Sequence, residues 1–240
     1  GFSAGLSLSG VYHHVETVRA RNDNGSDDTT STLGRLVEGR SYVNAGGVNM
    51  GLAAGIYYEP EDKNYRFGLS YTSQPGFGQT RMSGKLTQVF AEGAVGGDQN
   101  IDFLQTYPDI VRFGLAQKFG KKWEIFGDFE YVRWSVFDKQ CVVLEGKTCT
   151  LTPQGDNVPG VSPEPVILNI PRKWNDAVGL RIGPAYQVSD KVSLTGSVGF
   201  TTPAVPKSTI DASTIDALRL YFAAGTRIQL NNHFALGLAF

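Results

Sequence analysis

The feature that most constrains this chain is a strict alternation of apolar with polar or small residues, repeated along most of its 240 residues. In "YRFGLSYTS", aromatic and aliphatic side chains occupy one parity, while Arg66, Gly68, Ser70 and Thr72 occupy the other. Successive side chains of a β-strand point to opposite faces, so this pattern predicts strands with one apolar and one polar face. Helical periodicity is nearly absent. The chain is therefore predicted to be all-β, with antiparallel strands.

The connections between the predicted strands alternate regularly in length. Short turns are predicted at 59–64, 119–123, 188–191 and 230–233, and long polar connections near 20–43, 75–102, 142–165 and 202–214. About nine strands result, and several are longer than the ~5–6 residues usual in soluble sheets. Long strands, an aromatic-rich apolar face and this rhythm together indicate a transmembrane β-barrel. The sheet must close, because unpaired backbone groups at an open edge find no partner in lipid.

The barrel interpretation accounts for the stretch "KKWEIFGDFEYVRWS", residues 121–135. Its aromatic parity is predicted to face lipid, and its three acidic residues to face the lumen. Inward charges are common in barrels, so the acids are predicted to join arginines of other strands in a lumen charge network. An alternative is that Asp128 and Glu130 form a catalytic carboxylate pair. The predicted network comprises Arg66, Arg112, Glu124, Asp128, Glu130, Arg181 and Arg219.

Composition and motifs exclude several other classes of function. The formal net charge is −1 and there is no run of lysine or arginine, which argues against a nucleic-acid partner. No apolar run approaches the ~18–20 residues that a transmembrane helix needs. His13 and His14 are adjacent and would point to opposite faces of a strand, so they cannot share a metal. No Ser/His/Asp set stands out, and neither an enzyme nor a cofactor is expected.

The two cysteines, Cys141 and Cys149, flank the turn-like segment Glu145-Gly146-Lys147. This arrangement favours a disulfide within a loop and an oxidising compartment. The alternative is two unpaired thiols. A metal site is not favoured, because two cysteines alone do not complete a tetrahedral ligand set.

Several stretches resemble successive strands of the FadL-type outer-membrane transporters. They are "AAGIYYEPEDKNYRFGLSYTSQ", "YPDIVRFGLAQKFGKKWEIFGDFEYVRWSVFD", "WNDAVGLRIGPAYQVSDKVSLTGSVGFTTPAVP" and "LRLYFAAGTRIQL". The most telling marks are Pro108 opening a strand, the "YVRWSVFD" strand end and "GFTTPAVP". The resemblance covers nearly the whole chain. It implies a monomeric, 14-stranded barrel in the bacterial outer membrane, with an N-terminal plug in the lumen.

By this comparison, residues 1–240 are a single barrel segment covering roughly strands 5 to 13. The plug, the early strands and the last strand are expected to lie outside it. The chain opens with "GFSAGLSLSG", which reads as the middle of a strand and not as a signal peptide.

The resemblance implies passive transport of hydrophobic molecules such as long-chain fatty acids or hydrocarbons, with outer-membrane lipid as the surrounding partner and no cofactor. Apolar residues in the long connections are candidates for first contact with the substrate: Leu33, Leu36, Val37, Val89 and Phe90. Alternatively, these residues pack small cores within their own loops. The other function considered is a structural or adhesive barrel whose long extracellular loops bind a partner.

Overall fold

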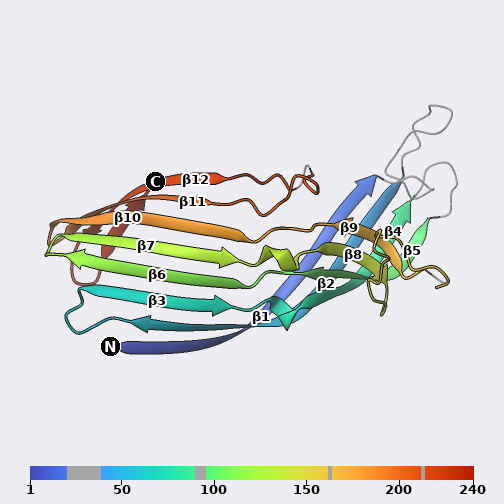
Figure 1. Ribbon diagram of the computed structural model, residues 1–240, viewed down its shortest axis with the longest axis horizontal. Coiled ribbons are helices and arrows are strands. Elements are labelled where there is room, and N and C mark those ends of the chain that lie inside the picture. Colours follow the sequence, from blue (N-terminus) through green and yellow to red (C-terminus); the bar gives the residue numbers. More distant parts are fainter. Residues whose placement is uncertain (21–38, 90–95, 162–163, 212–213) are drawn as a thin grey trace, which may run out of the picture.

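The computed structural model describes residues 1–20, 39–89, 96–161, 164–211 and 214–240. These residues form a single antiparallel sheet of 13 strands, which confirms the predicted all-β class (Figure 1). Two short 3-10 helices, η1 (Pro75–Phe77) and η2 (Trp134–Val136), interrupt the connections. Within the described residues, no helix has the length and apolarity needed to cross a membrane.

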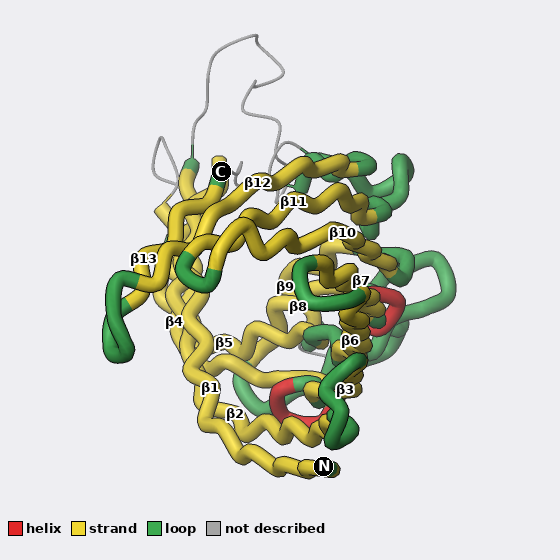
Figure 2. The backbone as a smooth tube through the Cα atoms, turned by 90° about the vertical axis from the view of Figure 1, so that its left-hand side faces the viewer, coloured by secondary structure: helices red, strands yellow, loops and turns green. Residues whose placement is uncertain are grey.

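Nine strands, called the wall below, follow one another around the sheet. Each pairs antiparallel with the next, and Figure 2 shows them arranged around a common axis. These nine strands correspond to the nine predicted from the sequence. They are β1 (Phe2–Ala20), β2 (Arg40–Tyr58), β3 (Tyr65–Thr72), β6 (Ile110–Phe119), β7 (Trp123–Val132), β10 (Ala177–Ser189), β11 (Val192–Thr201), β12 (Arg219–Gln229) and β13 (Ala235–Ala239).

The wall exposes its apolar parity on the outside. Leu6, Leu180 and Phe222 are 75%, 44% and 79% exposed. In water, an apolar surface of this extent would promote association, whereas in a bilayer it is the surface that contacts lipid. The opposite parity carries the charged and small residues and faces the lumen.

The short turns gather at one end of the wall and the long connections at the other (Figure 1). This is the separation that the alternating lengths predict. In outer-membrane barrels the short turns are periplasmic and the long loops extracellular.

The predicted count of nine strands missed four strands that lie in or beside two of the long connections. The connection 75–102 contains β4 (Gln79–Val89) and part of β5 (Gly97–Thr106). The connection 142–165 begins within β8 (Lys139–Leu144) and ends where β9 (Val166–Pro171) begins. These four strands, called the extension below, raise the count from nine to 13. In β4, polar residues such as Arg81 and Lys85 alternate with the core residues, and they made this stretch look like a polar connection in the sequence.

The sheet forks at β2. The half of β2 nearer the short turns, Ala53–Tyr58, pairs with β3, and the other half, Arg40–Gly46, pairs with β4. The strands β5, β8 and β9 continue the sheet from β4. The extension therefore stands on the wall at the end that carries the long connections (Figure 1).

The extension encloses a packed apolar core. Leu86 of β4 is buried in it, because its parity is that of the core. The core residues are Val43, Ala45, Met82, Leu86, Ile101, Phe103 and Val142, with Val15, Ile167 and Leu168 packed against them.

Candidate functional site

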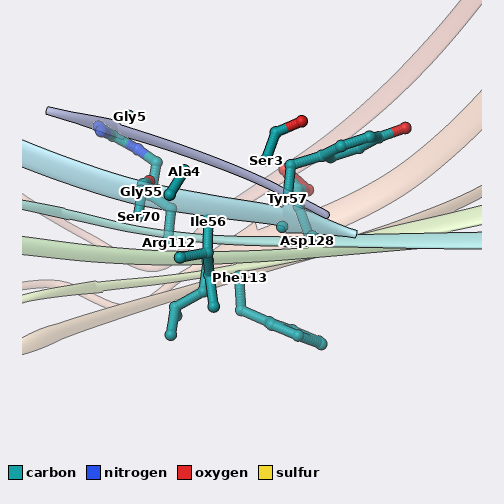
Figure 3. A pocket seen from close by; sticks show the side chains of 13 residues that line it. Ser3, Ala4, Gly5, Gly55, Ile56, Tyr57, Ser70, Arg112, Phe113 and Asp128 are labelled. Atoms are coloured by element: carbon teal, nitrogen blue, oxygen red, sulfur yellow. The ribbon is translucent and has the colours of Figure 1, made fainter. Parts of the chain in front are cut away.

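The lumen face of the wall contains a shallow hollow of ≈ 570 Å³ at the strands β1, β2, β3, β6 and β7. In Figure 3, the side chains of Ile56 and Phe113 point to one side of the strands, while Ser3 and Tyr57 point to the other. The hollow exists because most inward positions here carry no side chain or a very small one. Its volume lies within the range of small-molecule sites. Its inward residues include Ser3, Gly5, Gly55, Gly68, Ser70, Arg112, Gly114 and Asp128.

Beside the hollow, arginines and acids pair across the strands. The Arg112 Nε donates to Glu130 Oε2 over 2.6 Å, and the two residues stand opposite each other in register. Arg181 donates to both carboxylate oxygens of Asp128, over 3.0 and 2.7 Å, and again faces it directly. Arg66 of β3 forms an ion pair with Glu124 of β7. These three pairs are called the charge ladder below.

The charge ladder neutralises the lumen face more than it stabilises the fold. The side chains of Arg181 and Asp128 are 54% and 44% exposed. Exposed ion pairs of this kind contribute only about 0–1 kcal/mol. A second hollow of ≈ 500 Å³ lies along the ladder, and it shares Arg112 and Asp128 with the first. The first hollow and the charge ladder thus form one continuous surface.

The structure divides the predicted charge network. Six of its seven members form the ladder, but Arg219 lies apart and contacts Asp216, three residues before it, at 3.8 Å. The alternative catalytic pair is not favoured, because Asp128 and Glu130 are each engaged by a separate arginine. The described residues contain no group of three or more side chains able to hold a metal ion.

Of the candidates for first substrate contact, the structure describes one, Val89. Val89 ends β4 and is 63% exposed. Leu33, Leu36, Val37 and Phe90 lie outside the described residues.

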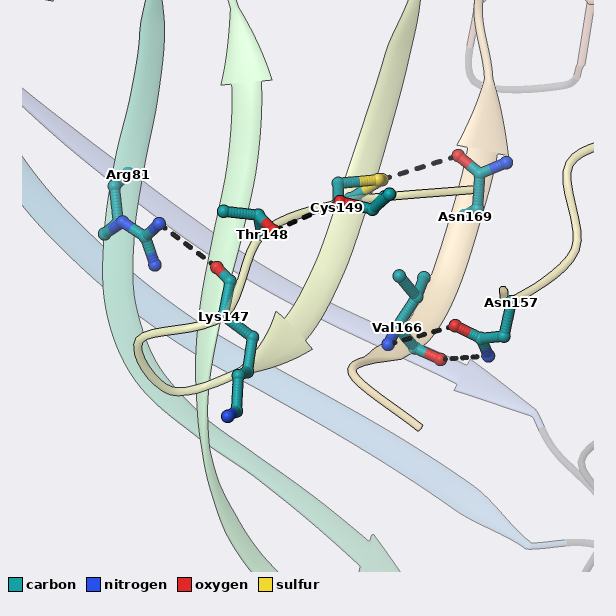
Figure 4. Close-up of a disulfide and its surroundings, with 9 residues drawn as sticks. Arg81, Lys147, Thr148, Cys149, Asn157, Val166 and Asn169 are labelled. Carbon is teal, nitrogen blue, oxygen red and sulfur yellow. Dashed lines mark hydrogen bonds between the residues drawn. A yellow bond between two sulfur atoms is a disulfide. The ribbon is translucent and has the colours of Figure 1, made fainter. Parts of the chain in front are cut away.

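Cys141 and Cys149 form a disulfide with a Cα–Cα distance of 6.1 Å, at the extension (Figure 4). Cys141 belongs to β8 and is fully buried. The disulfide therefore ties the segment after β8 to the sheet. Between Cys149 and β9 in the chain, Asn157 forms two hydrogen bonds of 3.0 and 3.3 Å with the backbone of Val166, the first residue of β9 (Figure 4).

A second anchor of the same segment, the buried carboxylate of Asp102, was not predictable from any local pattern. Asp102 accepts hydrogen bonds from Ser83 Oγ over 2.6 Å, from the Gly146 N–H over 2.7 Å and from Arg81. Burial by itself would raise the pKa of Asp102, but these hydrogen bonds and the charge of Arg81 hold that pKa below its usual value. Arg81 also donates to the Lys147 carbonyl over 3.1 Å (Figure 4).

A wall with an apolar exterior, a charged lumen face and long connections at one end is the architecture of an outer-membrane barrel. The family model described as "Outer membrane protein transport protein (OMPP1/FadL/TodX)" matches residues 1–240. The chain belongs to this family. It is thus an outer-membrane protein, and the resemblance to FadL-type transporters is confirmed.

Solved structures share this fold at low sequence identity. A FadL homologue of Pseudomonas aeruginosa superposes with a TM-score of 0.73 at 13% identity, covering 99% of this chain and 54% of that one. The toluene transporter TodX of Pseudomonas putida superposes with a TM-score of 0.60 at 16% identity, covering 99% and 59%.

A sequence relative comes from Neisseria meningitidis serogroup B. Its protein NMB0088, named as an outer membrane protein, is 23% identical over 184 residues, which cover 74% of this chain and 37% of that protein. The chain thus spans little more than a third of this relative and between half and two thirds of the two solved chains.

Proposed function

We propose that the whole protein carries hydrophobic small molecules passively across the bacterial outer membrane. The observation that carries the proposal is the hollow on the lumen face, where glycines and small side chains leave Cα and Cβ carbons exposed inside the barrel wall. Membership of the transport family supports it, as does the fold shared with a structure named as a toluene transporter.

A protein path is useful because the outer leaflet carries a polar, tightly packed lipopolysaccharide layer, which slows the entry of apolar solutes. The arginines and acids of the charge ladder are paired, which reduces the electric field in the lumen. An apolar molecule that enters therefore displaces water from neutralised pairs and not from isolated charges, which costs less free energy. Nothing in this scheme needs a cofactor or an energy source: sites of graded affinity let the solute move down its concentration gradient.

For the substrate we propose long-chain fatty acids as well as hydrocarbons. The hollow extends across five neighbouring strands, which leaves room for an extended chain as well as a compact ring. Val89, exposed at the end of β4, is proposed as one point of first contact, together with Leu33, Leu36, Val37 and Phe90. We also propose that the barrel acts as a monomer.

The test is uptake by intact cells with and without the full-length protein. Initial rates for radiolabelled palmitate and for toluene should both be higher with the protein. If neither compound enters faster, the transport proposal fails, and the structural or adhesive barrel takes its place.

A substitution in the hollow makes the test specific to the site. In Gly68→Val, the new side chain has room, because an added Cβ meets its nearest atom at 3.6 Å, and it should fill part of the hollow and slow uptake several-fold. The control is Gly237→Val on β13, where an added Cβ meets no described atom within 4 Å and which does not line the hollow. Equal uptake by both variants would show that the substrate does not pass through the hollow.

A further inference from the structure

On the side of the short turns, the outer face of the wall ends in a row of aromatic side chains. Phe119 stands opposite Trp123 in the β6–β7 pairing, and Trp123 stands opposite Tyr186 in the β7–β10 pairing. The ring centroids of Trp123 and Tyr186 lie 4.6 Å apart, and Phe119 and Trp123 are 49% and 50% exposed. Aromatic residues, Trp and Tyr above all, gather where a barrel meets the lipid head groups. The row therefore marks the level of the head groups at this end of the wall.

The row lies on strands that have neighbours on both edges. β6 pairs with β3 and β7, and β7 pairs with β6 and β10 (Figure 1). The backbone of both strands is thus engaged within the sheet, and their outer side chains are left to contact lipid.

The turn next to this row carries two lysines and no acid. It joins β6 to β7 as Gly120-Lys121-Lys122, and Gly120 has a φ of +65°, a conformation that favours glycine. Both lysines are exposed, and neither side chain has an ion-pair or hydrogen-bond partner among the described residues. The acid that follows the turn, Glu124, is already paired with Arg66. The two positive charges are therefore available to a ligand outside the protein.

The other short turns do not share this excess of positive charge. The turn 59–64 contains three acids and one lysine, the turn 188–191 contains one acid and one lysine, and the turn 230–233 contains neither. At the opposite end of the wall, two arginines are held by acids, Arg133 by Asp109 and Arg172 by Asp211. Among the four short turns, unbalanced positive charge is thus confined to the turn between β6 and β7.

We propose that Lys121 and Lys122 bind the head-group phosphate of an anionic phospholipid in the periplasmic leaflet, while its acyl chains lie over Trp123 and Tyr186. The short turns of outer-membrane barrels are periplasmic, and the periplasmic leaflet consists of phospholipids. Ammonium groups are donors only, and phosphate oxygens accept. A head group that carries its own positive charge gains less from two lysines than an anionic one does. The inference concerns the outer face, so it does not depend on which molecule passes through the lumen.

The test measures lipid binding to the full-length protein in mild detergent by native mass spectrometry. Phosphatidylglycerol and phosphatidylethanolamine with the same acyl chains are offered in equal amounts, and the unaltered protein should retain more phosphatidylglycerol. The double variant Lys121→Gln/Lys122→Gln should weaken phosphatidylglycerol binding about 10-fold or more, given the usual contribution of a lysine close to anionic lipid. Its binding of phosphatidylethanolamine should change less than about two-fold.

The matched control is Lys63→Gln/Lys191→Gln, which removes the same charge from two short turns that also contain acids. It should change phosphatidylglycerol binding less than about two-fold. A further variant, Trp123→Leu, should weaken both phospholipids alike, because the ring contacts acyl chains and not the head group.

The inference is overturned if the unaltered protein binds both phospholipids equally. It is also overturned if Lys63→Gln/Lys191→Gln reduces phosphatidylglycerol binding as much as Lys121→Gln/Lys122→Gln does, since net charge alone would then explain the effect. Loss of retained lipopolysaccharide in place of phosphatidylglycerol would assign the lysines to the other leaflet and contradict the inference as well. Should the double variant fail to fold, the two single variants give the same comparison.

Discussion

The wall and the extension are built from the same antiparallel sheet, yet they place their apolar residues on opposite sides. In the wall, Leu180 and Leu220 point outward and are 44% and 65% exposed. In the extension, Met82 and Ile101 point inward and are fully buried. The difference follows from the solvent: the wall is surrounded by lipid, whereas the extension must bury its apolar area away from water.

A single strand, β2, contains the change from one arrangement to the other. Val43 and Ala45 occupy the inward parity and are buried in the core, but Val48 and Met50 occupy the outward parity and are exposed. The apolar residues of β2 change from the inward to the outward parity at Gly46–Gly47. A side chain at Gly47 would meet the Arg81 carbonyl oxygen at 2.6 Å, so glycine is required where β4 approaches β2. A change of apolar parity within one strand therefore marks where this barrel leaves the membrane.

The largest expected effect concerns the core of the extension. Phe103→Ala removes a buried aromatic ring and should destabilise the extension by about 3–5 kcal/mol. Hydrogen exchange of the full-length protein should show faster exchange in β4, β5 and β8, with protection in β10–β12 unchanged. Loss of protection throughout the wall would show that the two regions unfold as one unit.

The next effect tests which face of the wall contacts lipid. Leu180→Arg places a charge on the outer face and should destabilise the barrel by about 2–4 kcal/mol, while the neighbouring Gly179→Ser on the lumen face should cost far less. An added Cβ at Gly179 meets its nearest atom, Thr201 Oγ1, at 3.4 Å, so the serine has room. Urea unfolding of the protein reconstituted in lipid vesicles measures the free energy of unfolding of both variants. Equal losses would invalidate the assignment of the faces.

A smaller effect concerns the Asp102 anchor, which the wall does not share. Because its folded pKa is depressed, the carboxylate stabilises the extension above the unfolded value near 4, and this contribution is lost as pH falls through the folded pKa. Asp102→Asn should cost about 1–3 kcal/mol at neutral pH and remove that acid sensitivity. The rate of proteolysis of the segment 145–150 at several pH values measures this stability. The control is Asp98→Asn, which changes an exposed carboxylate. An unchanged acid response in Asp102→Asn would assign the sensitivity to another group.

The smallest effect lies in the charge ladder. A double-mutant cycle with Arg181→Met and Asp128→Asn should give a coupling energy below about 1 kcal/mol, because both side chains are about half exposed. A coupling of several kcal/mol would mean that the lumen is much drier than this exposure indicates.

The sequence predicted the wall well and the extension poorly. In the wall, the alternation is local and uninterrupted, so parity alone assigns residues such as Phe129 to the outside and Asp128 to the lumen. The extension depends on the pairing of β4 with half of β2, which is a long-range contact that no local pattern reports. The disulfide was predictable from the spacing of two cysteines around a turn. The role of Asp102 was not, because it comes only from burial and from the pairing of β4 with β5.

Flux into vesicles measures whether the protein opens the proposed passive path for hydrophobic molecules. The full-length protein would be reconstituted into vesicles whose outer leaflet is lipopolysaccharide, with no energy source, and the entry of a fluorescent fatty acid would be followed over time. Vesicles with the protein should approach the same final level as protein-free vesicles, but faster. Entry at the protein-free rate, or accumulation above that level, would contradict it.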